Sequence, residues 1–135
     1  MAELSGTGLR ALVIDDDRPS RTLVRAVLEL EGWDVREASD AAVGLVLASS
    51  DPPHAVVLDV MLPGRDGFDV LAELRQSVHG RGMAVVMLSA MTQPVDIARG
   101  KRLGVDAYLT KPFEPQDLAE LLVHHARRYY PAGPS

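Results

Sequence analysis

Short apolar runs that alternate with helical patterns constrain the fold of this chain more than any other feature. Nearly uninterrupted runs rich in β-branched residues are typical of strands that are covered on both faces, as in a parallel sheet. The segment WDVREA at 33–38 instead alternates apolar and polar residues, which predicts a less buried strand at an edge of the sheet. The continuous runs are ALVI at 11–14, AVVL at 55–58, AVVMLS at 84–89 and AYLT at 107–110.

Helical patterns lie between and after these runs, at 19–31, 40–49, 68–78, 92–103 and 115–130. Apolar residues three or four positions apart within a helix predict a face that turns toward a core. The residues expected to point inward are Leu23, Val24, Val27, Leu28, Phe68, Val70, Leu71, Leu74, Leu118, Leu121 and Leu122. A strand followed by a helix five times over predicts an α/β fold, with one parallel sheet, helices on both faces and right-handed crossovers.

Length and composition indicate one globular domain. The chain has 135 residues, of which 47% are hydrophobic, and we expect one domain over 1–130 with 131–135 as a flexible tail or the start of a linker. A net charge of −5 argues against direct nucleic-acid binding, and the absence of cysteine excludes disulfides and thiolate metal sites. Without a signal-peptide pattern or an apolar run of ~18–20 residues, a cytoplasmic protein with no membrane segment is expected.

Polar residues follow four of the expected strands at the point where each strand ends. The first run is followed by DDD at 15–17, the third strand by Asp59, the fourth ends on Ser89, and Lys111 follows the fifth. Function in an open parallel α/β sheet gathers at the carboxyl ends of the strands, so we expect these groups to meet. Carboxylates repel at short range, and a hard cation such as Mg²⁺ relieves that repulsion. An aspartate there can act as a nucleophile toward phosphorus, with the lysine and hydroxyl on the remaining oxygens.

Each residue taken alone also has an ordinary structural interpretation. Asp16 or Asp17 can cap the helix that begins near Pro19, because aspartate is a favoured N-cap residue. Asp66 and Gly67 can form a simple turn. A single serine or lysine at a strand end is unremarkable, and only the coincidence of different groups at one edge predicts a functional site.

Four segments together give a specific resemblance to a known family. The segments LVIDDD, VVLDVMLPGRDGFDVL, VVMLSA and DAYLTKPF, within 10–128, resemble the receiver domain of two-component response regulators. The resemblance implies a flavodoxin-like, doubly wound (βα)5 fold with a five-stranded parallel sheet of order 2-1-3-4-5. It implies that Asp59 is the phosphoacceptor, that the fourth strand supplies a switch hydroxyl, and that a cis peptide bond joins the phosphate-binding lysine to Pro112. The further implied roles fall on Asp15, Asp16 and the Met61 carbonyl as Mg²⁺ ligands, Ser89 and Lys111 at the phosphoryl group, and Tyr108 as the switch aromatic.

The resemblance also implies a function, that of a phosphoacceptor switch in a two-component system or phosphorelay. The expected donor is a phosphohistidine on a histidine kinase or phosphotransfer protein, and the receiver would catalyse its own phosphorylation and slow dephosphorylation. The surface of the fourth helix, fifth strand and fifth helix would then change for a downstream effector or a fused output domain. The protein would be a monomer or a phosphorylation-dependent dimer, although Ala107 replaces a second acid found in many dimerising members.

Two other functions fit parts of the pattern. In an aspartyl-phosphate hydrolase of the haloacid-dehalogenase type, the D-x-D in DDDRP would make Asp15 the nucleophile, and Asp15 rather than Asp59 would become labelled. A receiver-like docking scaffold that is never phosphorylated would show no labelling by small phosphodonors.

Two further expectations concern two methionines near the expected site and an apolar stripe on the last helix. Met61 and Met91 stand two residues beyond Asp59 and Ser89, and both are bulky and apolar. We expect them to flank the path of the hydrolytic water and to prolong the phosphorylated state. Val123 and Tyr130 lie seven residues apart in the last helix, and we expect them to form a solvent-facing stripe for a partner.

Overall fold

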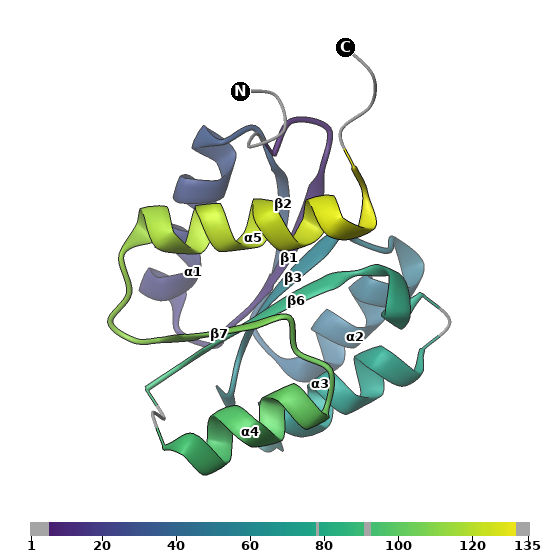
Figure 1. The fold of residues 1–135 in the computed structure, drawn as a ribbon, viewed down its shortest axis with the longest axis vertical. Helices are drawn as coiled ribbons and strands as arrows, with labels where there is room; N and C mark the ends of the chain where they lie inside the picture. The colour runs from purple at the N-terminus through teal and green to yellow at the C-terminus, as the bar shows by residue number, and fades with distance from the viewer. Residues whose placement is uncertain (1–5, 78, 91–92, 132–135) are drawn as a thin grey trace.

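The computed structural model describes residues 6–77, 79–90 and 93–131, and a five-stranded parallel sheet forms its centre (Figure 1). In spatial order the strands are β2 (Asp34–Ala38), β1 (Arg10–Ile14), β3 (Ala55–Asp59), β6 (Ala84–Ser89) and β7 (Ala107–Thr110). All four neighbouring pairs in this sheet are parallel. Because β6 and β7 are its fourth and fifth strands along the chain, the predicted order 2-1-3-4-5 is confirmed, and WDVREA does supply an edge strand.

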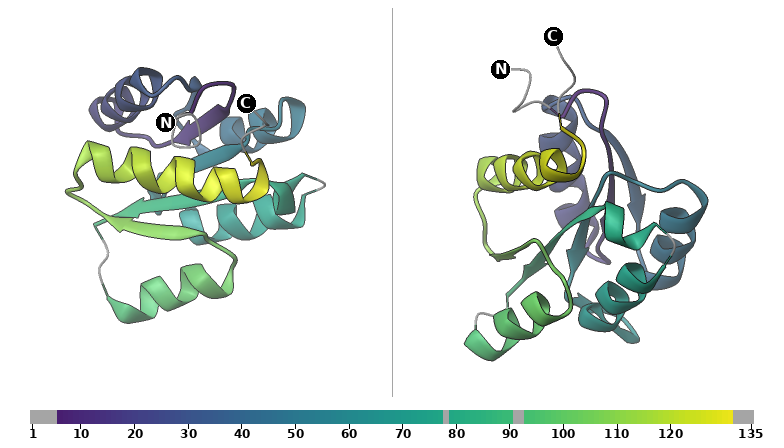
Figure 2. Two further views of the ribbon diagram at one scale, coloured as in Figure 1. Left: turned by 45° about the horizontal axis from the view of Figure 1, so that its top comes forward. Right: turned by 45° about the vertical axis from the view of Figure 1, so that its right-hand side comes forward.

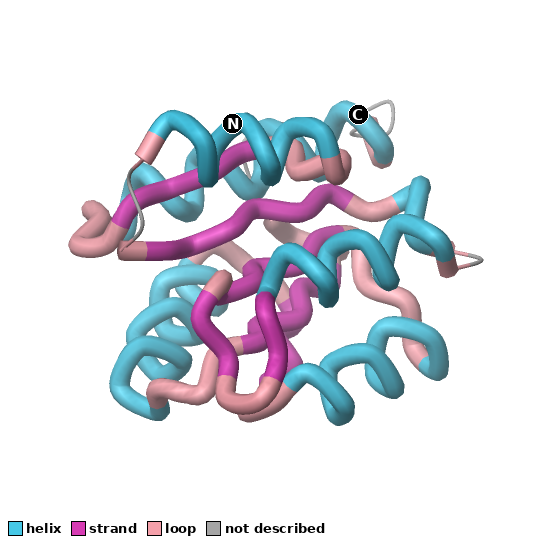
Figure 3. The backbone as a smooth tube through the Cα atoms, turned by 90° about the horizontal axis from the view of Figure 1, so that it is seen from below, coloured by secondary structure: helices cyan, strands magenta, loops and turns pink. Residues whose placement is uncertain are grey.

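Helices cover both faces of the sheet (Figure 2). One face packs against α1 (Arg18–Leu30) and α5 (Pro115–Tyr129), and the other against α2 (Ala41–Ser50), α3 (Gly67–Gln76) and α4 (Pro94–Arg102). Seen from below, the strands run between these helical layers (Figure 3). A short hairpin of β4 (Met61–Leu62) and β5 (Arg65–Asp66) follows β3, and a 3₁₀ turn, η2 (Gly80–Gly82), precedes β6. No described helix has the length and apolar character needed to span a membrane.

Successive residues of the central strands point into two separate cores. In β3, Val57 belongs to the core under α1 and α5, whereas Val56 belongs to the core under α2 and α3. The same alternation places Val86 and Val85 of β6 in the two cores, and all four valines are at most 1% exposed. Burial on both faces is the reason that these strands are apolar at every position rather than at alternate positions.

Two helices differ from the predicted pattern in the direction of particular side chains. In α1, Val24 and Leu28 are fully buried, but Leu23 is 47% exposed, because one residue is a rotation of about 100° around a helix. In α5, Val123 is only 3% exposed, so the prediction of a solvent-facing stripe is wrong. Leu121, expected to point inward, is instead only partly buried. The inner face of α5 consists of Leu118, Ala119, Leu122, Val123 and Ala126, since it packs against both the sheet and α1.

An arginine and an aspartate join several elements at the end of the sheet where β6 and β7 begin. Arg75 of α3 donates to the carbonyls of Gly104 and Met83, at 2.7 and 2.5 Å, and to Asp106 Oδ2 at 2.9 Å. Asp106, just before β7, also accepts from the Val85 amide at 2.8 Å and through Oδ1 from the Tyr129 hydroxyl at 2.9 Å. This Arg75–Asp106 bracket connects α3, β6, β7 and α5.

The burial of Val123 leads to a stability prediction. Val123→Ala should lower the free energy of unfolding by about 2 kcal/mol, because it removes two buried methyl groups and leaves a cavity. Val46→Ala is the control, since Val46 is also helical but 63% exposed, and it should change stability by no more than about 0.5 kcal/mol. Urea unfolding followed by circular dichroism measures both values. Equal effects of the two substitutions would contradict the burial of Val123.

Candidate functional site

Four parallel strands bring the predicted polar residues to one edge of the sheet. Asp15 directly follows β1, Asp59 is the last residue of β3, Ser89 is the last residue of β6, and Lys111 directly follows β7. The strands are in parallel register, so these ends lie side by side. Asp15, Asp59 and Ser89 are buried, at 2%, 6% and 0% exposure. The Lys111 amide donates to the Ser89 carbonyl at 2.7 Å, which fixes the lysine beside that strand end.

Lys111 lies between two carboxylates. Its Nζ is 3.1 Å from Asp59 Oδ2 and 3.3 Å from Asp15 Oδ2. The ammonium group therefore offsets part of the repulsion between Asp15 and Asp59. The peptide bond between Lys111 and Pro112 is cis, as the family resemblance implies.

Three carboxylates form a cluster that could hold a metal ion. Asp15, Asp16 and Asp59 each offer an oxygen, and these oxygens lie within 4.8 Å of one another. Asp16 is exposed while the other two are buried, so the cluster opens to solvent on one side. Oxygen donors with a shared negative charge match the ligand preference of hard divalent cations. The donor set therefore fits the predicted cation.

Backbone amides hold two of these carboxylates in place. Asp15 Oδ1 accepts from the Asp17 amide at 2.9 Å, and Asp59 Oδ1 accepts from the Met61 amide at 3.0 Å. In each residue, the second oxygen, Oδ2, faces Lys111. The orientation of both acids is thus set before any ligand binds.

Burial, hydrogen bonds and neighbouring charges shift the pKa values of Asp59, Asp15 and Lys111. Burial, together with the nearby Asp15 carboxylate, raises the pKa of Asp59 to about 6, although the Met61 amide and Lys111 oppose the shift. Burial also acts to raise the pKa of Asp15, but hydrogen bonding with the Asp17 amide and Asp59 outweighs it and holds that pKa below its usual value. For Lys111, burial is outweighed by the Asp59 and Asp15 carboxylates, which raise its pKa.

Two neighbouring acids, Asp17 and Asp66, cap helices. Asp17 caps α1, since Oδ2 accepts from the Ser20 amide at 3.1 Å, whereas Asp16 joins the acid cluster. Asp66 does more than shape a turn, because its Oδ1 accepts from the Phe68 amide at 2.8 Å and caps α3.

Gly67, which the Asp66-Gly67 pair predicts only as part of a turn, also lies against the backbone of the site. A Cβ at this position would lie 2.5 Å from the Asp59 carbonyl oxygen and 2.5 Å from Val60 Cα. A side chain there would force the backbone at Asp59 and Val60 to shift. The spacing from Asp59 alone does not reveal this contact, because it depends on how the β4–β5 hairpin folds back.

The remaining predicted site residues lie around this centre. Tyr108 of β7 is partly buried and packs against the core beneath α3, together with Leu103 and Val105. Met61 is 63% exposed, and its backbone amide donates to Asp59 in the acid cluster. Met91 lies outside the described residues, as do 132–135 of the predicted tail.

The fold and the edge cluster define a class of protein. The family model for the response regulator receiver domain matches residues 11–123. The chain belongs to this family, and it is a signalling switch of the receiver type.

Solved structures of similar proteins agree with this assignment. A CheY-like response regulator receiver domain protein from Methanospirillum hungatei JF-1 is 26% identical with a TM-score of 0.85, covering 93% of this chain and 98% of that one. The receiver domain of the Francisella response regulator 1452 is 30% identical with a TM-score of 0.83, covering 90% and 98%. A probable two-component system response regulator/GGDEF domain protein is 28% identical with a TM-score of 0.85, and the match covers 93% of this chain but 52% of that one.

The raised pKa of Asp59 leads to a prediction about stability and pH in the absence of metal. The folded state binds this proton more tightly than the unfolded state, so stability falls as pH rises from the unfolded value of 3.8 through about 6. Asp59→Asn should therefore gain stability relative to the parent, on the order of 2–3 kcal/mol between pH ~4 and pH ~7 in EDTA. Urea unfolding of both proteins across this range measures the difference. His54 and His125 are present in both proteins, so their contributions cancel, and a difference that does not change with pH would contradict the prediction.

Proposed function

We propose that this receiver domain accepts a phosphoryl group on Asp59 from a phosphohistidine of a histidine kinase or phosphotransfer protein. The observation that carries the proposal is the meeting of Asp59 with Asp15 and Lys111, within 3.3 Å of the lysine nitrogen. An Asp59 carboxylate oxygen forms the bond to phosphorus while the bond from phosphorus to the histidine nitrogen breaks and the imidazole leaves. Structural packing alone does not account for two buried acids and a lysine at one point.

We assign Mg²⁺ to the acid cluster, held by Asp15, Asp16, Asp59 and the Met61 carbonyl. When bound, the ion supplies positive charge that neutralises the carboxylates and the phosphoryl oxygens. Lys111 already faces Asp59 Oδ2, so its ammonium group is placed to stabilise an oxygen of the transferring group. In this way the chain promotes its own phosphorylation and the slower loss of phosphate.

The switch itself is assigned to Ser89 and Tyr108. A phosphoryl oxygen on Asp59 attracts the Ser89 hydroxyl, which is buried at the end of the neighbouring strand β6. Movement of Ser89 lets the partly buried Tyr108 turn further inward on β7. The surface of α4, β7 and α5 then changes. A downstream effector or a fused output domain responds to the larger population of this second conformation.

The same proposal includes the domain bounds, the cellular location and the oligomeric state of the protein. Residues 1–130 act as one receiver domain, and 131–135 are a tail or the beginning of a linker to an output domain, as the GGDEF-containing relative suggests. The chain works in the cytoplasm, as a monomer or a phosphorylation-dependent dimer, without contacting nucleic acid or membrane itself. Asp106 is engaged with Arg75 and Tyr129 inside the chain, which leaves it less available for ion pairs across a dimer.

The two other candidate functions have less support. In the hydrolase of the haloacid-dehalogenase type, Asp15 would attack phosphorus, but the family assignment and the position of Asp59 at the lysine favour Asp59. A scaffold that is never phosphorylated would have no need of the three-carboxylate cluster.

Labelling with acetyl phosphate tests the proposal directly. In the presence of Mg²⁺ the protein should gain one phosphoryl group, detected by intact mass, and Asp59→Asn should remain unlabelled. Asp69→Asn is the control, because that acid is 66% exposed on α3, and it should label like the parent. Label on Asp15 would support the hydrolase, and the absence of label on the parent would support the scaffold.

The exposed Met61 side chain leads to a prediction about the lifetime of the phosphorylated state. Met61→Asn should speed the loss of phosphate about tenfold, equivalent to ~1.4 kcal/mol of barrier, because an amide can orient the attacking water that a thioether only covers. Loss of the phosphorylated mass over time gives the rate. Val95→Asn replaces another exposed apolar residue, 68% exposed on α4, and should keep the parental rate. If Met61→Asn loses phosphate at the parental rate or more slowly, then the Met61 side chain does not prolong the phosphorylated state.

A further inference from the structure

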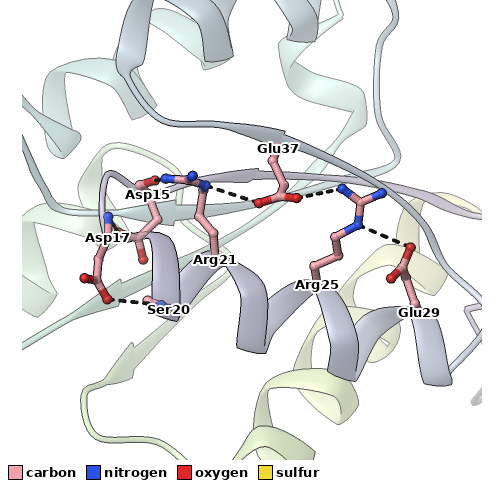
Figure 4. Close-up of polar contacts among 7 residues, drawn as sticks. All are labelled: Asp15, Asp17, Ser20, Arg21, Arg25, Glu29 and Glu37. Carbon is pink, nitrogen blue, oxygen red and sulfur yellow. Dashed lines mark hydrogen bonds and ion pairs between the residues drawn. The ribbon is translucent and has the colours of Figure 1, made fainter.

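An arginine of α1 contacts the backbone of the metal-site residue Asp15. Arg21 Nη1 donates to the Asp15 carbonyl oxygen at 2.8 Å, and Arg21 Nε donates to Glu37 Oε1 on β2 at 3.2 Å (Figure 4). The Arg21 side chain is only 14% exposed, so the two contacts are largely shielded from water. A single guanidinium group therefore connects the end of β1 to the neighbouring strand β2.

This contact completes the restraint of Asp15. The Asp15 amide donates to the Ala38 carbonyl at 3.1 Å, and its Oδ1 accepts from the Asp17 amide at 2.9 Å. With the Asp15 carbonyl bound to Arg21, the remaining oxygen, Oδ2, faces Lys111 and the acid cluster. Any rotation of the peptide after Asp15 would break the Arg21 hydrogen bond and turn the chain that carries Asp16.

Glu37 keeps Arg21 in position and balances its charge. Glu37 accepts from Arg21 through Oε1 and from Arg25 Nη1 through Oε2 at 2.6 Å, and Arg25 in turn pairs with Glu29 at 3.3 Å. The hydrogen bond from Arg25 and that from Arg21 hold the pKa of Glu37 below its usual value, so Glu37 is charged at neutral pH. Arg25 shares this network but, unlike Arg21, makes no described hydrogen bond to Asp15.

We infer that Arg21, held by Glu37, is a positioning residue for cation binding by Asp15 and Asp16. The inference deepens the proposed function, on which it rests, because it concerns the same metal site. Groups that orient a metal ligand typically change metal affinity about 10- to 100-fold when they are removed.

Removing Arg21 has two effects on the affinity for a cation, and these act in opposite directions. The direction of the measured change shows whether the loss of charge or the loss of orientation is larger. The guanidinium is a positive charge near the acids, so its loss by Coulomb's law alone would make a cation bind more tightly. Loss of orientation would make the cation bind more weakly. Lysine retains the charge but not the planar fork that reaches both the Asp15 carbonyl and Glu37, so Arg21→Lys isolates the orienting effect.

Mn²⁺ is a suitable probe, because its free concentration can be followed by electron paramagnetic resonance without any phosphorylation. Arg21→Lys and Arg21→Gln should each weaken Mn²⁺ binding by about tenfold. Arg25→Gln, the matched control in the same network, should stay within about twofold of the parent, since Arg25 does not orient Asp15. Parental or tighter binding by Arg21→Lys would overturn the inference.

A kinetic measurement separates metal affinity from a general structural effect. In acetyl phosphate labelling, Arg21→Lys should need about tenfold more Mg²⁺ for half-maximal rate, yet reach the parental rate at saturation. A lower rate at saturating Mg²⁺, with unchanged metal demand, would contradict a positioning role. Circular dichroism and urea unfolding confirm that each variant is folded, and the milder Arg21→Lys decides the question where Arg21→Gln does not fold.

Failure of the inference and failure of the proposed function give different results. If the parent and Asp15→Asn bind Mn²⁺ equally weakly, the acid cluster is not the metal site, and the proposed function fails with it. If the parent binds Mn²⁺, Asp15→Asn does not, and the Arg21 variants match the parent, then only the role of Arg21 is wrong.

Discussion

An imbalance of charge at one edge of the sheet governs the site. Among the described residues, three carboxylates of Asp15, Asp16 and Asp59 meet there, and Lys111 supplies one ammonium group between two of them. Burial keeps water from screening the excess negative charge, and burial together with the nearby Asp15 carboxylate raises the pKa of Asp59 to about 6. Hydrogen bonding with the Asp17 amide and Asp59 holds the pKa of Asp15 below its usual value despite its burial. The site therefore stores an unfavourable interaction of the kind that a divalent cation offsets.

The surrounding loops prevent the acids from moving apart to reduce their repulsion. Amides of Asp17 and Met61 hold one oxygen of each buried acid, and Gly67 lets the hairpin lie against the Asp59 backbone. Asp17 also caps α1, so the residue that orients Asp15 simultaneously fixes the start of the helix. The local folding of these loops and the electrostatics of the site thus depend on the same hydrogen bonds.

The sequence predicted the sheet and the polar edge well, for a physical reason. Strands buried on both faces leave continuous apolar runs, and parallel strands must end together, so the residues after each run could be placed without coordinates. The direction of single helical side chains was less predictable, since Leu23 and Val123 depend on how each helix is rotated against its neighbours. Arg21 was missed because its partner Glu37 lies on another element, and no local pattern relates the two.

The Arg75–Asp106 bracket holds one end of α4 in place. It ties Gly104 and Asp106, the residues between α4 and β7, to α3, β6 and α5, at the end of the sheet far from Asp59. The C-terminal end of α4 is thereby anchored, while its first turn at Pro94 lies toward the acid edge. We therefore expect any displacement of α4 to be smallest at Gly104, which the bracket holds, and largest at the first turn beside the site. A change around Asp59 would then tilt α4 about its C-terminal end rather than shift the helix as a whole.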